Sequence, residues 1–339
     1  MAPRRTLGET GTAAGDAPSA DAPESRGWPL RLHGRIVVDV MSTVVLAPTF
    51  RQRITGFVLL TKPRIIELLL VTTVPTQIVA ARGVPALSIM VFTVIGGTLA
   101  AGGAHVVNMV VDRDIDAIMG RTRNRPLVTG VVKPNEALVF AVVLEVAAFA
   151  LLWSTINLIS AALAFAAFAW YVFVYTLWLK RTSSRNIVIG GAAGAVPVLI
   201  GWTSVTGELA WAPVILFFVI VYWTPPHFWA LAMRFSDDYS AADVPMLPSV
   251  SGYHTTAVRI IGYTVVLWAL TLVFGPVADM GIIYLAAALV LGGIFLGFAW
   301  RLKQTESPKL AMKMFGYSIT YVTLLFGAMV VDQLVRWGH

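Results

Sequence analysis

The sequence predicts an all-helical protein that crosses a membrane about nine times. Hydrophobic residues make up 57% of the 339 residues and charged residues only 13%. The mean hydropathy is +0.76, which is typical of polytopic membrane proteins rather than of soluble domains. Apolar runs of about 18 residues or more, long enough to span a bilayer as helices, recur along the chain. Basic residues gather in alternate connections between these runs.

The N-terminal part differs from the rest of the chain. Residues 1–50 contain no long apolar run, and the composition of the first 35 is typical of disordered segments. Residues 36–48 are apolar but too short to span a bilayer, and Asp39 interrupts them, so we expect an interfacial segment there. The sequence therefore predicts an extension over residues 1–50 and a membrane domain over residues 51–339.

Nine apolar runs form the membrane domain. In chain order they cover residues 65–82, 86–110, 136–154, 156–179, 186–204, 211–232, 257–277, 280–300 and 314–334. The third and fourth runs are parted only by a short turn near residues 155–157. We expect Pro197 to kink the fifth run, and Pro225 with Pro226 to kink the sixth, because proline offers no backbone donor.

The basic residues predict the orientation of the chain. They precede the first run and follow the second, fourth, sixth and eighth runs: Lys62, Arg64, residues 113–133, Lys180, Arg181, Arg185, Arg234, Arg301, Lys303, Lys309 and Lys313. The other connections and the tail carry Arg82 and Arg336. By the positive-inside rule, the N-terminus is cytoplasmic and the C-terminus lies outside, in a multi-pass protein of the plasma (cell inner) membrane.

The same charges and the absence of cysteine exclude several function classes. The formal net charge of +7 is explained by topology, so no nucleic-acid partner is expected. The chain contains no cysteine, which excludes disulfides, thiolate catalysis and cysteine metal sites.

A polar motif stands where the second run meets its basic loop. Asn108, Asp112 and Asp116 are spaced by four residues, so on a helix they fall on nearly one face. Carboxylates at a bilayer edge indicate a functional site, and two carboxylates with an amide oxygen suit Mg²⁺. Arg121 and Arg125 follow, and arginine suits phosphate. The motif therefore predicts a site for a metal-bound diphosphate at the membrane surface.

A second polar cluster follows the sixth run on the same predicted side. His227 comes directly after the two prolines, and Asp237 with Asp238 stands further along the loop. Each acidic cluster is expected to hold one cation on a shared diphosphate, so that about two Mg²⁺ ions bridge it. Taken singly, an Asp-Asp pair in a loop is usually solvated surface, and a membrane histidine often closes a contact between helices.

Several stretches resemble the UbiA superfamily of intramembrane prenyltransferases. They are LLTKPRIIELLL, NMVVDRDIDAIMGRTRNRP, YTLWLKRTSSRNIVIGGAAGAVPVLIGW and PPHFWALAMRFSDDYSAADVPMLP, and the resemblance covers residues 55–335. The last stretch is similar to the branch of the superfamily that acts on heme. Asp243 is a departure, because a glycine is expected there, and this affects the shape of the loop rather than the resemblance.

The resemblance implies a nine-helix bundle around a central cavity, with membrane lipid around it. It implies farnesyl diphosphate as donor, heme B as acceptor and heme O as product, on the route to heme A of terminal oxidases. Heme A synthase or oxidase assembly proteins are the further partners that it suggests.

Within that activity the candidate residues take separate roles. Asn108, Asp112, Asp116, Asp237 and Asp238 are expected to hold Mg²⁺, and Arg121, Arg125 and Lys180 to contact phosphate. His227 is expected to hold heme, to move a proton or to brace the proline kink. Side chains that could face the cavity and a farnesyl cation are His105, Tyr171, Tyr175, Tyr222, Trp223 and Phe228.

Two other functions stay open on the sequence alone. One is a prenyltransferase of the same superfamily that acts on a quinone precursor or another tetrapyrrole. The other is a cation-coupled transporter, although transporters place such carboxylates near the midplane rather than at one face. A purely structural subunit of an oxidase would need neither acidic cluster.

Overall fold

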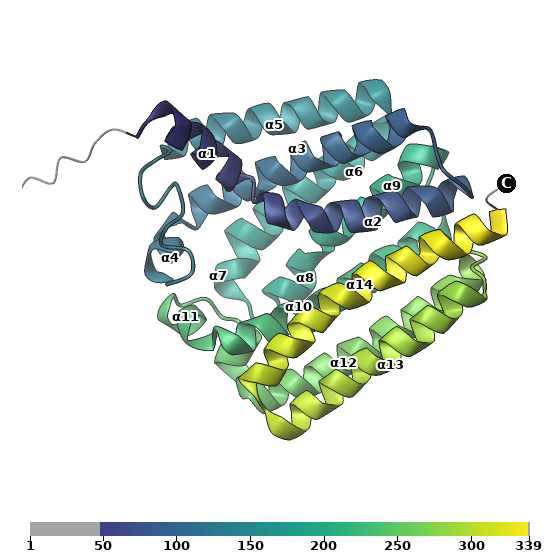
Figure 1. Ribbon diagram of the computed structural model, residues 1–339. Coiled ribbons are helices and arrows are strands. Elements are labelled where there is room, and N and C mark those ends of the chain that lie inside the picture. The colour runs from purple at the N-terminus through teal and green to yellow at the C-terminus, as the bar shows by residue number, and fades with distance from the viewer. Residues whose placement is uncertain (1–47, 338–339) are drawn as a thin grey trace, which may run out of the picture. The chain divides into compact units, whose positions relative to one another are not determined.

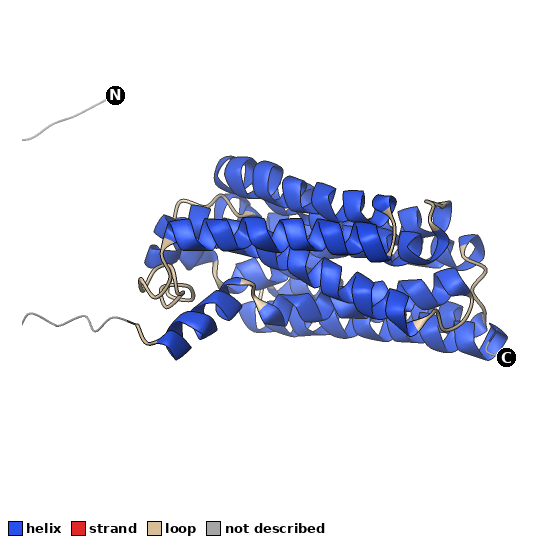
Figure 2. Ribbon diagram, turned by 90° about the horizontal axis from the view of Figure 1, so that it is seen from above, coloured by secondary structure: helices blue, strands red, loops and turns tan. Residues whose placement is uncertain are grey.

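The computed structural model describes residues 48–337, and within that range the regular structure is helical. Figure 1 shows the helices side by side, with α4 and α11 at one end and the close of α14 at the other. Figure 2, turned by 90°, shows that the long helices share one general direction. The predicted extension over residues 1–50 falls almost entirely outside the described residues.

The element order follows the predicted runs closely. The elements are α1 (Phe50–Leu60), α2 (Pro63–Ala81), α3 (Leu87–Val111), α4 (Arg113–Ile118), α5 (Pro134–Thr155), α6 (Leu158–Ala169), η1 (Trp170–Leu179), α7 (Lys180–Thr182), α8 (Asn186–Gly190), η2 (Gly191–Ala195), α9 (Val196–Thr206), α10 (Trp211–Arg234), α11 (Ser236–Ala241), α12 (Leu247–Val277), α13 (Ile282–Thr305) and α14 (Pro308–Trp337). Each of the nine predicted runs coincides with one helix or with several that abut.

Eight helical stretches among the described residues are long and apolar enough to cross a membrane. The ninth predicted span is α2, which has 19 residues and an apolar part over Val71–Ala81. The prediction of an all-helical, multi-pass membrane protein is therefore confirmed. The third and fourth runs are separate helices, because Asn157 caps α6 by accepting a hydrogen bond from the Ser160 amide at 2.8 Å.

Two spans are built from more than one kind of helix. The fourth passes from α6 into the ten-residue π-helix η1, and the fifth passes from α8 through the short 3-10 helix η2 into α9. Helices of the π type are rare and occur often at functional sites, since the wider turn redirects side chains. Both irregular stretches lie beside the cavity described below.

The prolines and a glycine shape the C-terminal half. Helix α10 continues through Pro225 and Pro226, so these residues do not end it. Helix α12 begins earlier than predicted, at Leu247, and contains a break at Gly252, whose φ of 73° favours glycine.

Helix α1 was not predicted from the sequence. Thr49 and Gln52 form a capping box at its start. Arg53 forms an ion pair with Glu136 of α5 at 2.9 Å, and Gly56 packs against the side chains of Val131 and Val132. These contacts fix α1 against the start of α5 and the loop before it.

Helices α2 and α9 pack closely at Gly201, which gives a stability prediction. A Cβ atom at Gly201 would lie 2.7 Å from the carbonyl oxygen of Thr73. A backbone oxygen cannot swing away, so Gly201→Ala is expected to destabilise the protein by about 1–3 kcal/mol and to lower its Tm in detergent. Gly297→Ala is the matched control, because nothing lies within 4 Å of its added Cβ. Equal Tm values for the two variants would contradict this packing.

Candidate functional site

Asn108, Asp112 and Asp116 lie together at the end of α3 and on α4, and all three are buried. The backbone N–H of Asp112 donates to the backbone carbonyl of Asn108 at 2.9 Å. The backbone N–H of Asp116 donates to the backbone carbonyl of Asp112 at 2.8 Å. The helical hydrogen-bond pattern thus continues across the junction, although Asp112 leaves helical geometry. Asn108 Nδ2 donates to Asp112 Oδ2 at 2.6 Å and to Thr176 Oγ1 at 3.2 Å. The predicted side-by-side placement is present in the structure.

Three basic side chains from distant segments surround this motif. Lys180 Nζ donates to Asp112 Oδ2, and Arg125 Nη1 pairs with Asp116 Oδ2 at 2.5 Å. Lys62 Nζ donates to Asn108 Oδ1 at 2.9 Å. The result is a largely buried cluster of two carboxylates, one amide and three cations, whose excess of positive charge suits an anion such as diphosphate.

Lys62 was missed as a site residue, because its charge had been assigned to topology. It adopts a left-handed conformation, with φ of 54° and ψ of 63°, at the start of α2. This backbone turns its side chain toward the end of α3. Burial, together with the nearby charges of Arg125 and Lys180, lowers the pKa of Lys62 to about 7, although Asp112 and Asp116 act to raise it.

The donor atoms fit a magnesium ion that shares its ligands with a substrate. Asp112 Oδ1 is buried without a hydrogen-bond partner in the described structure, and Arg181 Nη2 lies 4.0 Å from it. Residues 48–337 contain no group of three His, Cys, Asp or Glu side chains arranged to hold a metal alone. Mg²⁺ is commonly bound by one or two carboxylates together with substrate phosphates, which matches this set.

Asp114, between the two site carboxylates in the sequence, is exposed and pairs with Arg181. Arg181 donates to its Oδ1 and Oδ2 at 2.7 and 2.8 Å and to the Val111 carbonyl at 2.9 Å. The hydrogen bonds from Arg181 lower the pKa of the Asp114 carboxyl to about 2. This exposed pair connects α7 to α4 at the surface of the site.

The second acidic cluster lies on α11, near the first. Asp237 is exposed and Asp238 is half-buried. Helix α4 and the segment from α11 onward share an apolar contact cluster formed by Ile115, Met119, Ile187, Ala232, Tyr239, Ala242, Val244 and Met246. Arg121 lies over the Phe235 ring at 5.7 Å. Within the described residues, neither Asp237 nor Asp238 forms an ion pair with Arg121 or Arg125. The two loops therefore meet through apolar packing and through the contacts of Arg121 with Phe235 and Tyr239.

Asp243 adopts the backbone conformation that explains why a glycine was expected there. Its φ is 51°, in the left-handed region that favours glycine, although Asp tolerates it better than most residues. The Val244 amide donates to the Tyr239 carbonyl at 3.0 Å, which closes the loop after α11. Aspartate thus keeps the turn in place.

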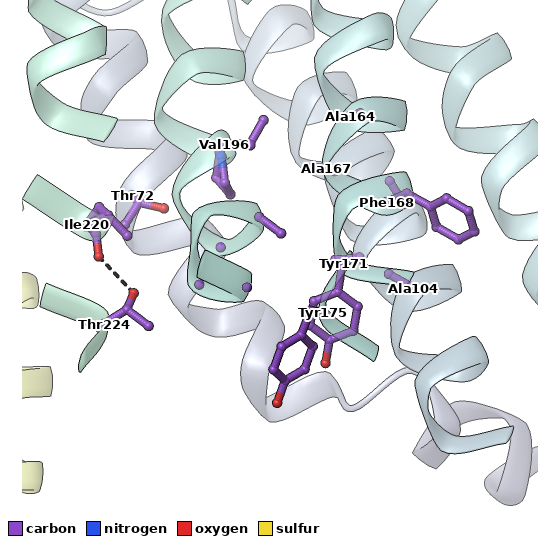
Figure 3. A pocket seen from close by; sticks show the side chains of 18 of the residues that line it. Thr72, Ala104, Ala164, Ala167, Phe168, Tyr171, Tyr175, Val196, Ile220 and Thr224 are labelled. Atoms are coloured by element: carbon purple, nitrogen blue, oxygen red, sulfur yellow. Dashed lines mark hydrogen bonds between the residues drawn. The ribbon is translucent and has the colours of Figure 1, made fainter. Parts of the chain in front are cut away.

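A largely apolar cavity of about 250 Å³ begins beside the polar cluster. Its walls come from α3, α6, η1, α8, η2, α9 and α10, with Thr72 of α2. Five of the candidate residues named from the sequence line it: His105, Tyr171, Tyr175, Trp223 and Phe228. Figure 3 shows Tyr171 and Tyr175 at one end and Ala164 and Val196 toward the other.

Two contacts connect the cavity to the polar cluster. Thr176, which accepts from Asn108, follows the cavity-lining Tyr175 directly. His105 stands one helical turn before Asn108 on α3 and contacts the Tyr171 ring edge-on at 5.4 Å. A Cβ atom at Gly190 would overlap the Tyr175 ring, so glycine is needed where α8 passes this side chain. A substrate whose charged end binds at the polar cluster would therefore extend its apolar part into the cavity.

Tyr222 and His227 do not line this cavity. Tyr222 packs against Tyr263 of α12, with ring centroids 5.5 Å apart. His227 stacks between Trp223, at 4.3 Å, and Phe315 of α14, at 4.5 Å. Its Nδ1 is 2.6 Å from Ser318 Oγ. His227 therefore joins α10 to α14 one turn from the cavity wall.

Comparisons with known proteins agree on one family. The model of the UbiA prenyltransferase family matches residues 69–326. A relative from Frankia casuarinae, named protoheme IX farnesyltransferase, is 52% identical over 284 residues, covering 83% of this chain and 98% of the relative. One of the same name from Streptomyces avermitilis is 48% identical over 293 residues, covering 85% and 96%.

Solved structures share the fold at low sequence identity. A structure described for digeranylgeranylglyceryl phosphate synthase has a TM-score of 0.71 and 18% identity, covering 84% of this chain and 99% of that one. A UbiA homologue from Archaeoglobus fulgidus, bound to GPP and Mg²⁺, has a TM-score of 0.58 and 16% identity, covering 81% and 99%.

Proposed function

This chain belongs to the UbiA prenyltransferase family and is a prenyltransferase, and from that premise we propose that it transfers the farnesyl group of farnesyl diphosphate to a vinyl group of heme B, with addition of water, to give heme O and diphosphate. The observation that carries this proposal is the buried, cation-rich cluster at one end of an apolar cavity. The names of relatives with about half their residues identical support the donor and the acceptor.

The polar cluster would bind the diphosphate. Lys62, Arg125 and Lys180 converge on the motif. Arg121, which is exposed and lies over the Phe235 ring, would reach the phosphate from the loop after α4. Asp112, with its unpartnered Oδ1, would hold Mg²⁺ together with Asn108 and Asp116. A bound Mg²⁺ ion would neutralise charge on the diphosphate and so make it a better leaving group. Asp237 and Asp238 are the candidates for a second ion, on the loop packed against α4.

The cavity would hold the farnesyl chain and its reacting carbon. When the bond between carbon and the diphosphate oxygen breaks, positive charge develops on the allylic carbon beside the cluster. The rings of Tyr171 and Tyr175 line the cavity and would stabilise this cation through their faces. The terminal vinyl carbon of heme then forms the new carbon–carbon bond, and the neighbouring carbon becomes cationic. Water adds to that carbon and loses a proton, which leaves the hydroxyl group of the product.

The orientation and partners of the protein follow from the same proposal. We place the polar cluster on the cytoplasmic side of the plasma membrane, with the C-terminus outside, because the basic connections lie at the end that carries α4 and α11. Heme A synthase or oxidase assembly proteins would receive the product.

The titration of Lys62 predicts a pH dependence of anion binding. Lys62 lies outside the spanning helices, and its lowered pKa of about 7 means that it is charged below this pH and neutral above it. The affinity of the free protein for inorganic diphosphate is therefore expected to fall as the pH rises from about 6 to about 8.5. Calorimetric titration in detergent measures this, and Lys62→Arg is the control, since arginine stays charged. Because both proteins are measured at each pH, the effect of diphosphate protonation on the affinity is the same for both and drops out of the comparison. Parallel curves for the two proteins would contradict the assignment.

An acceptor assay tests the proposed reaction. Membranes containing the protein are incubated with labelled farnesyl diphosphate and with heme B, a chlorophyll-type tetrapyrrole or 4-hydroxybenzoate as acceptor. Label is expected in the heme fraction alone, with a mass gain of one farnesyl group and one hydroxyl group. Label in the aromatic acid or the other tetrapyrrole would replace heme as the acceptor.

A further inference from the structure

His227 is held in one orientation by three neighbours. Its ring lies within 21° of parallel to Trp223 on one side and within 29° of parallel to Phe315 on the other. Ser318 of α14 supplies the third contact, at 2.6 Å from Nδ1. The imidazole plane is therefore fixed by two stacked rings and one hydrogen bond.

The hydrogen bonds of Ser318 determine which ring nitrogen of His227 carries the proton. Ser318 Oγ donates to the Phe315 carbonyl at 2.6 Å. A serine hydroxyl has one proton to donate, so toward His227 it can only accept. Nδ1 is then the protonated nitrogen, and Nε2 of the neutral ring carries a free lone pair. Nε2 has no hydrogen-bond partner among the residues that the structure describes.

We propose that Nε2 of His227 binds the iron of the heme substrate, and that Ser318 is the positioning residue that presents it. This rests on the proposed function, since it requires heme as the acceptor. A histidine that binds a metal through one nitrogen usually donates the other N–H to an oxygen, as Nδ1 does here. On α10, His227 stands one turn beyond Trp223 and next to Phe228, which both line the cavity. Iron bound to Nε2 would lie next to these cavity-lining residues.

The alternative is that His227 only braces α10 against α14. Another contact already does this, because Trp223 Nε1 donates to the backbone carbonyl of Ser318 at 2.8 Å. Ser318→Ala removes the hydroxyl and keeps that carbonyl, so it separates the presentation of Nε2 from the joining of the two helices.

Resonance Raman spectroscopy of the ferrous, heme-loaded protein tests the proposal. The wild type is expected to show an iron–imidazole stretch that is missing in His227→Ala. Ser318→Ala should move the stretch to lower frequency, because Nδ1–H loses its acceptor, and should raise KM for heme about tenfold without changing KM for farnesyl diphosphate. Ser318→Thr restores both values. Thr320→Ala, which removes an exposed hydroxyl two residues along α14, leaves both as in the wild type.

The outcomes separate the proposal from the reaction on which it rests. A wild type that farnesylates heme but shows no iron–imidazole stretch overturns the ligand assignment, as does a stretch that persists in His227→Ala. A spectrum and KM unchanged in Ser318→Ala overturn the role of Ser318. A wild type that binds heme through imidazole but does not farnesylate it contradicts the proposed function and supports the ligand assignment. The absence of the stretch in the wild type overturns the assignment even where a variant fails to accumulate.

Discussion

Asp112→Asn is expected to lower the rate of prenyl transfer by about 10²–10³-fold while the protein still accumulates in the membrane. Asp112 is fully buried, accepts from Lys180 and Asn108 through Oδ2, and leaves Oδ1 without a hydrogen-bond partner in the described structure. The amide keeps the shape of the side chain but removes the negative charge that would hold Mg²⁺ and balance Lys180. Initial rates with farnesyl diphosphate and heme B measure the effect.

Asp114→Asn is the matched control for this variant. Asp114 stands two residues away, is exposed and pairs with Arg181 rather than with the cluster. Its replacement is expected to change the rate by less than about threefold, because exposed ion pairs contribute little. Equal rates for the two variants would contradict the role of Asp112. Activity that persists in excess chelator would contradict the Mg²⁺ assignment.

Ala164→Phe is expected to change which donor the enzyme accepts. Ala164 lines the cavity and lies two helical turns before Tyr171 in the same span, toward the end remote from the polar cluster (Figure 3). A phenyl ring there shortens the space for the prenyl chain. We expect kcat/KM for farnesyl diphosphate to fall about 100-fold, while that for geranyl diphosphate stays within about threefold of the wild type.

The control for the cavity prediction is Ala162→Phe on the same helix. Ala162 is exposed, on the face directed away from the cavity lining, so the added ring should leave both donors unaffected. Equal losses of kcat/KM with farnesyl and geranyl diphosphate in Ala164→Phe would show that the cavity does not hold the prenyl chain. The loss would then be explained by a general disturbance of α6.

The spans and the first motif could be predicted because their signals are local. Runs of about 18 apolar residues define helices by composition alone, and all nine predicted runs coincide with helical segments. The four-residue spacing placed Asn108, Asp112 and Asp116 correctly, because the helical hydrogen bonds continue past the end of α3. The irregular spans were not predicted, since a π-helix depends on neighbouring helices rather than on its own sequence.

The composition of the site depends on contacts that the sequence does not show. Lys62 is 46 residues from Asn108 along the chain, and only the left-handed turn before α2 brings its side chain to the cluster. Tyr222 and Trp223 are adjacent, but successive helical residues point about 100° apart, so one packs on α12 and the other lines the cavity. His227 was recognised as unusual from its position, whereas its partner Ser318, 91 residues away, was not.

The heme content of membranes with and without this protein tests the central claim most directly. Hemes are extracted from cells that lack the gene and from the same cells complemented with the wild type or with Asp112→Asn. Loss of heme O and heme A with heme B retained, restored by the wild type and not by Asp112→Asn, is the predicted result. An unchanged heme profile in cells that lack the gene, with label from farnesyl diphosphate appearing in another acceptor, would contradict the assignment of heme as the substrate.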